Sequence, residues 1–99
     1  ERNIALKRFD SLNIIIEKPC ILKIDVQGVE ERVLEGFGEY LNYIDFVLTE
    51  VLFKNYHKNQ TQYSNIFKLL ENAGFNGFIQ LNPCIENGKL NHCDLLFWR

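Results

Sequence analysis

Two dense apolar runs, residues 20–26 and 44–53, frame an amphipathic segment near the middle of the chain. The first run is interrupted only by Lys23 and Asp25, and such a pattern suits a strand covered on both faces, as in a parallel sheet. Apolar residues between the runs recur at helical spacing: Val29, Val33, Leu34 and Phe37. The pattern therefore predicts a strand, a short helix and a second strand.

These three elements form a predicted βαβ unit, whose crossover is almost always right-handed and whose strands are parallel. We expect the two strands to be adjacent, with their carboxyl ends at one edge of the sheet. Upstream, the loose alternation of residues 4–9 predicts a short strand, and Asp10 and Ser11 offer helix-start chemistry for a helical turn.

A second amphipathic helix follows a polar loop. Its apolar stripe consists of Tyr63, Ile66, Phe67, Leu70 and Ala73. Thr61 can cap the start of this helix, and Gly74 can end it in a left-handed conformation with Phe75 as the accompanying apolar contact.

A β-hairpin is predicted at the C-terminal end of the sequence. Two strand patterns, residues 78–81 and 94–98, flank the dipeptide Asn87-Gly88, which is a strong hairpin-turn signal. We expect this hairpin to pair antiparallel to the rest of the sheet, with Trp98 in or beside the core. The whole pattern is typical of the α/β class.

Composition and charge exclude several classes of protein. The 99 residues are 46 % apolar and carry a formal net charge of −2, with no basic run that would indicate a nucleic-acid partner. No apolar stretch is long enough for a membrane span or a signal peptide, so we expect no membrane association. Three cysteines without C-x-x-C spacing argue against disulfides and a zinc site, and favour the cytoplasm.

The most informative stretch is LKIDVQGVE, residues 22–30. It resembles the FkbM methyltransferase family, which has a K-x-D-x-x-G-x-E motif, a following L-x-G and an acidic residue on a later strand. The matching positions are Lys23, Asp25, Gly28, Glu30, Leu34, Gly36 and Glu50. Residues 9–12, Phe-Asp-Ser-Leu, also resemble the family's upstream L-D-x-L element.

This resemblance implies S-adenosylmethionine-dependent methyl transfer to a small-molecule or glycan acceptor, with a hydroxyl oxygen as the expected target. The implied fold is the C-terminal half of a Rossmann-like class I methyltransferase sheet, in the order βαβαβ plus an antiparallel terminal hairpin. The family's glycine-containing first loop has no counterpart in this sequence. We therefore expect residues 1–99 to be the C-terminal part of one domain, whose N-terminal half is the missing partner and holds most of the cofactor.

Three carboxylates are the candidate catalytic residues. Ligands of open α/β sheets bind outside the carboxyl ends of the strands, which is where Asp25 and Glu50 are predicted to lie. The resemblance also gives Asp25 a role in cofactor binding, although an aspartate there can equally cap the next helix. Glu30 is either catalytic or a first-turn carboxylate favoured by the helix dipole. His57, beside Tyr56 on the following loop, is a candidate general base, and no metal is expected.

Two rival functions stay open. A non-catalytic α/β binding or assembly module could keep the same half-sheet, because fold alone does not fix function. A hydrolase or phosphoacceptor domain could use Asp25, but the sequence has no G-x-S-x-G motif, no G-K-[ST] motif and no neighbouring acidic pair.

Overall fold

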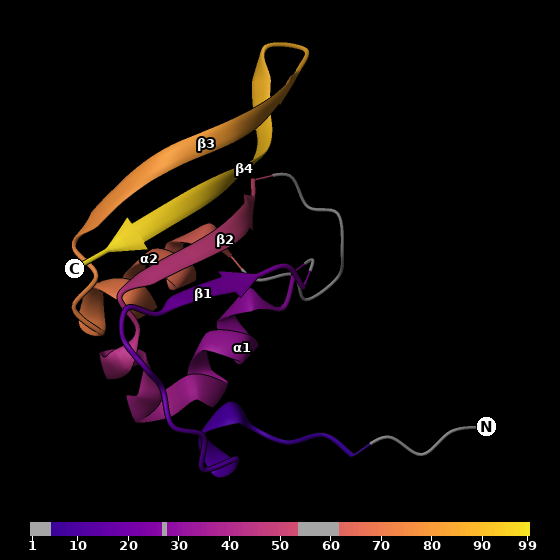
Figure 1. Cartoon of the computed structure of the whole chain (residues 1–99). Helices are drawn as coiled ribbons and strands as arrows, with labels where there is room; N and C mark the ends of the chain where they lie inside the picture. Colours follow the sequence, from indigo (N-terminus) through magenta and orange to yellow (C-terminus); the bar gives the residue numbers. More distant parts are fainter. Residues whose placement is uncertain (1–4, 27, 54–61) are drawn as a thin grey trace.

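The computed structural model describes residues 5–26, 28–53 and 62–99, and in them it shows a small α/β fold with a mixed four-stranded sheet (Figure 1). The strands are β1 (Ile21–Ile24), β2 (Phe46–Leu52), β3 (Gly77–Glu86) and β4 (Lys89–Trp98). The helices are α1 (Glu30–Phe37) and α2 (Tyr63–Asn72), with the 3-10 segments η1 (Phe9–Ser11) and η2 (Gly38–Tyr43).

The strand order is β1-β2-β4-β3. Strands β1 and β2 are adjacent and parallel, which confirms the predicted βαβ unit around α1. Strand β4 lies between β2 and β3 and is antiparallel to both. The chain therefore forms the edge strand β3 first, and the hairpin then brings β4 back between β3 and β2. The predicted antiparallel hairpin is confirmed, and β3 runs in the same direction as β1 and β2.

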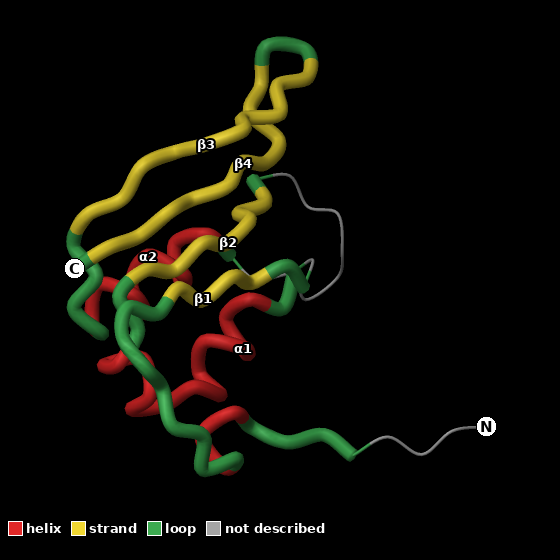
Figure 2. Tube along the Cα trace, viewed as in Figure 1, coloured by secondary structure: helices red, strands yellow, loops and turns green. Residues whose placement is uncertain are grey.

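Both helices cover the same face of the sheet (Figures 1 and 2). Alternate residues of β2, namely Val47, Thr49 and Val51, point to this face and are almost fully buried, as the period of two along a strand requires. The core they join also contains Ile24, Leu34, Phe37, Leu41, Ile44, Ile66, Leu70, Phe75, Cys93, Leu95 and Phe97.

The opposite face of the sheet is open in the described part of the chain. It presents the alternate residues of the same strands, and many of the apolar ones are exposed: Ile21, Phe46, Ile79, Leu81 and Trp98. This face is therefore most apolar at the amino ends of β1 and β2, and it becomes polar towards the carboxyl end of β2, at Glu50.

The end of α2 has the predicted left-handed cap. Gly74 has φ 95°, and the amide of Phe75 donates to the carbonyl of Leu70 at 2.9 Å, which closes the helix as in a Schellman motif. Phe75 is buried in the core. At the hairpin, Asn87 and Gly88 both have positive φ, as a two-residue turn of this kind requires.

Three sequence-based expectations need correction or lie outside the described residues. Residues 5–8 form no strand, so the predicted N-terminal strand is wrong there, while the helical turn is the 3-10 segment η1. Phe97, not Trp98, occupies the core, because Trp98 points to the open face, where its ring lies against Gly77. Thr61 lies outside the described residues.

No helix in residues 5–26, 28–53 and 62–99 is long and apolar enough to cross a lipid bilayer.

Candidate functional site

The register of the sheet brings three carboxylates to one level. Ile24 pairs with Thr49, so Asp25, the next residue, comes level with Glu50. Glu50 in turn lies directly opposite Asp94 on β4. Asp25 directly follows β1, and Glu50 lies two residues before the end of the neighbouring parallel strand β2. The third carboxylate, Asp94, comes from the antiparallel strand β4.

These side chains line one pocket of about 350 Å³ on the open side of the sheet. Its lining residues are Lys23, Ile24, Asp25, Leu48, Thr49, Glu50, Asn82 and Asp94. The volume lies at the lower end of the range of small-molecule sites. Asp25 and Glu50 therefore do point towards one edge, as the sequence predicted, and their surroundings form a cavity there.

Glu50 and Asp94 are an unfavourable pair for the sheet alone. Like charges directly opposite each other on antiparallel strands destabilise the pairing. Only part of this repulsion is offset within the described residues, because Asn82 Nδ2 donates to Asp94 Oδ2 at 3.0 Å. A group that donates hydrogen bonds to both carboxylates would remove the conflict, and such local conflicts are typical of functional sites.

Asn82 reaches the pocket through an irregularity in β3. The register of β3 and β4 shifts between Leu81 and Cys84, and Asn82 between them has φ 49°. A bulge of this kind re-aims side chains beside a site. Sequence reasoning did not name Asn82 or Asp94 as site residues; the Asn82-Pro83 dipeptide inside a strand pattern was the available signal for a bulge.

Glu30 does not line the pocket. Its side chain is 2 % exposed, and both carboxylate oxygens accept from the backbone amide of Gly28, at 3.0 and 3.1 Å. Gly28 has φ 107°, so the carboxylate fixes the tight turn between β1 and α1. This geometry supports the structural interpretation of Glu30, and its catalytic role stays a prediction.

Of the remaining candidate residues, Lys23 lies at the pocket, His92 lies away from it and His57 is outside the described residues. Lys23 lines the pocket from β1, and no carboxylate of the described residues lies within ion-pair distance of it. His92 lies opposite Leu52 on β4, away from the pocket lining. Tyr56 and the candidate base His57 lie outside the described residues, and among the described residues the pocket carboxylates are the candidate bases.

The pocket can bind groups that donate hydrogen bonds or carry positive charge. It holds three carboxylates, one amide and one ammonium group, and carboxylates accept hydrogen bonds from hydroxyl and amine groups. An anionic ligand would meet repulsion from most of the lining. The arrangement therefore suits binding of a hydroxyl-bearing ligand and removal of its proton.

Comparison with protein families shows the class to which this fold and site belong. The model of the methyltransferase FkbM domain matches residues 1–76. The chain therefore belongs to the FkbM methyltransferase family. No curated protein and no solved structure matches it. The match contains Asp25, Glu30 and Glu50 and ends before β3, so Asn82 and Asp94 lie beyond it.

Proposed function

We propose that this chain contributes the acceptor side of an S-adenosylmethionine-dependent methyltransferase that acts on a hydroxyl oxygen. The observation that carries the proposal is the pocket that Asp25 and Glu50 both line, near the carboxyl ends of two adjacent parallel strands of an FkbM-family chain. This is the position where open α/β sheets bind their ligands.

The residues present fit the proposed methyl donor. S-adenosylmethionine carries a positive sulfonium and an ammonium group, and when bound it supplies an electrophilic methyl group. Asp25 is exposed and directly follows β1, so its carboxylate can accept a hydrogen bond from the donor without leaving a buried charge. The excess of carboxylates in the pocket favours a cation by simple attraction.

Glu50 is the proposed general base. It is half-buried at the pocket wall, and its carboxylate has no hydrogen-bond partner among the side chains of the described residues. A carboxylate within hydrogen-bond reach of the acceptor hydroxyl both orients the oxygen and takes its proton as the methyl group is transferred. Asp94, opposite Glu50, would hold the same hydroxyl or its neighbour.

We further propose that the sheet is the C-terminal half of a Rossmann-like class I methyltransferase fold. The order β1-β2-β4-β3 with β4 antiparallel supports this arrangement. Strand β1 is at the edge of the described sheet, where a further strand from the N-terminal half of the same domain can pair with it. That half would supply most cofactor contacts. The three free cysteines are compatible with a cytoplasmic location.

The test is methyl transfer by the chain joined to its N-terminal half, with radiolabelled S-adenosylmethionine and a set of methyl glycosides and simple alcohols as acceptors. Glu50→Gln should lower the rate by about a hundredfold, the loss expected for a general base, and leave cofactor affinity unchanged. Glu39→Gln, an exposed charge change far from the pocket on η2, is the control. Full activity of the Glu50 variant would refute the assigned base.

A non-catalytic assembly module is the second candidate, because the open face of the sheet exposes Phe46, Ile79 and Trp98. Exposed apolar patches of this kind often mark interaction sites. This function predicts no tight binding of S-adenosylmethionine even when the N-terminal half is present. Calorimetric titration of the joined protein separates the two functions, since micromolar affinity supports the enzyme and no heat of binding supports the module.

A further inference from the structure

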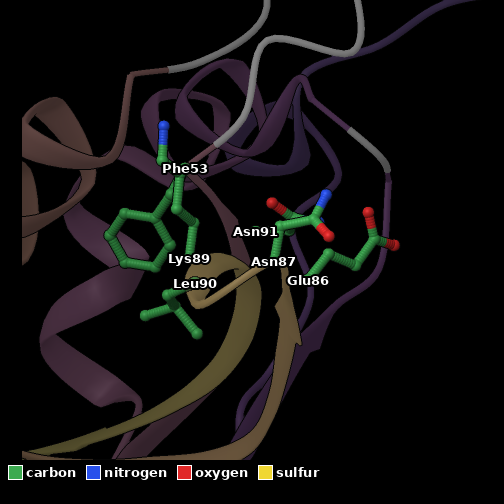
Figure 3. A pocket seen from close by; sticks show the side chains of 6 residues that line it. All are labelled: Phe53, Glu86, Asn87, Lys89, Leu90 and Asn91. Carbon is green, nitrogen blue, oxygen red and sulfur yellow. The ribbon is translucent and has the colours of Figure 1, made fainter.

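A second cavity lies beside the hairpin, away from the carboxylate pocket. Its volume is about 400 Å³, within the range of small-molecule sites. Figure 3 shows its lining residues, Phe53, Glu86, Asn87, Lys89, Leu90 and Asn91. All but Phe53 belong to the hairpin, which lies beyond the family match. Membership of the family therefore assigns no role to this cavity.

Asn91 is the residue that points to a ligand. It is 6 % exposed, and its buried Nδ2 has no hydrogen-bond partner among the described residues. A buried donor without a partner is costly and calls for an explanation. Its backbone is fixed, since the Asn91 carbonyl accepts from the Phe53 amide at 2.7 Å. The last torsion of an asparagine side chain is soft, so the amide can turn to an oxygen that enters the cavity.

The rest of the lining is amphipathic and balanced in charge. In the view of Figure 3, the Phe53 ring and Leu90 lie on one side of the cavity and the Glu86 carboxylate on the other. The Phe53 ring is held against Tyr63, with ring centroids 4.9 Å apart. Glu86 and Lys89 bring one negative and one positive charge to the lining. The lining as a whole therefore attracts neither a simple anion nor a simple cation, which is compatible with a neutral ligand.

We propose that this cavity binds a neutral, hydroxyl-rich ring of the carbohydrate class. An oxygen of the ring accepts from Asn91, a hydroxyl donates to Glu86, and the apolar C–H face packs on Phe53. A purely apolar ligand would leave the Asn91 donor unpaired. The lining thus requires a hydrogen-bond acceptor, a hydrogen-bond donor and an apolar face in one neutral molecule. A sugar ring has all three.

The cavity is separate from the proposed catalytic pocket. Asn91 lies three residues from Asp94 along β4, and side chains an odd number of residues apart on a strand point to opposite faces, so Asn91 faces the covered side of the sheet and Asp94 the open side. Binding of the sugar ring therefore does not rest on the proposed function.

The experiment is an NMR titration of the ¹⁵N-labelled chain with methyl β-D-glucopyranoside and methyl β-D-galactopyranoside, without a methyl donor. At least one should shift the amide signals of the cavity residues. Asn91→Leu should weaken this binding about tenfold, the value of one lost hydrogen bond with its partner left unpaired, and should raise the melting temperature. Asn42→Leu, at an exposed asparagine on η2, should change neither.

Three outcomes would overturn the proposal: no shifts with either glycoside at millimolar concentration, equal affinity of the Asn91 variant, or preferential binding of acetate or N-acetylglycinamide. If Asn91→Leu does not fold, Phe53→Leu replaces it, with the same tenfold loss expected from removal of the ring. Because no methyl donor is present, loss of methyl transfer with intact sugar binding would refute the proposed function alone.

Discussion

At the scale of single residues, Asp25 is the best-supported candidate for a role in methyl transfer. It ends an apolar strand pattern, it is exposed at the pocket, and it lies within the residues that the family model matches. The structure gives it no hydrogen bond to the backbone of α1 within the described residues, so the helix-cap alternative has no support there.

Asp25→Asn keeps the volume of the side chain and removes its charge. In the protein joined to its N-terminal half, we expect a loss of about 2–4 kcal/mol of transition-state stabilisation, a drop of about a hundredfold or more in methyl transfer. The melting temperature should not change, because the side chain is exposed. A destabilised variant with normal specific activity would return Asp25 to a structural role; initial rates and thermal melts distinguish the two.

Sequence reasoning found some pocket residues and missed others for physical reasons. Asp25 and Glu50 were predictable because each interrupts an apolar run at the carboxyl end of a predicted parallel strand. Asn82 and Asp94 were not, because their approach depends on the register of β3 and β4 and on the bulge between Leu81 and Cys84. A register cannot be read from an irregular strand such as β3, whose residues are mostly exposed.

At the scale of elements, the turn from β1 to α1 depends on a carboxylate at the start of the helix. Glu30 is the first residue of α1, and its side chain turns back to the amide of Gly28. This contact resembles the reciprocal half of a capping box, in which a carboxylate near the helix start binds an upstream amide. It positions the turn that follows Asp25.

Glu30→Ala should destabilise the fold, because it leaves a buried amide without an acceptor. We expect a loss of about 1–3 kcal/mol, which for a chain of this size lowers the melting temperature by at least about 4 °C. Glu35→Ala, an exposed position on the same helix, should change it little. A Glu30 variant that keeps full stability and loses methyl transfer would instead make this carboxylate catalytic.

Elements with a strong local signal were predicted more accurately than those without. Helices α1 and α2 follow from their apolar stripes, and the hairpin turn follows from Asn87-Gly88. The lengths of β3 and β4 were underestimated, because the part of the hairpin near its turn is polar and projects past the helices (Figure 2). The strand expected from residues 4–9 has no sheet neighbour in the described part of the chain, and short alternation alone does not make a strand.

At the scale of the whole molecule, the described residues cover the sheet on one face only. The covered face carries the core, and the open face carries Ile21, Phe46 and Trp98 in one row across three strands, followed by Ile79, Leu96 and Leu48 in the next. Apolar rows of this kind are rarely left in water by a stable protein. We infer that the open face is covered in the functional protein, by the N-terminal half in the enzyme or by a partner in the assembly module.

The isolated chain should consequently associate through this face. Replacing Phe46 and Ile79 by Lys places two charges in the apolar rows, and each side chain is at least two-fifths exposed, so the fold should tolerate the change. Sedimentation velocity should show association of the chain that grows with concentration, and a monomer for the double variant. Ile85→Lys, at a more exposed apolar residue near the hairpin turn, should leave association unchanged. If the double variant associates as strongly as the original chain, some other surface is responsible, and the open face would lose its support as the interface with the N-terminal half.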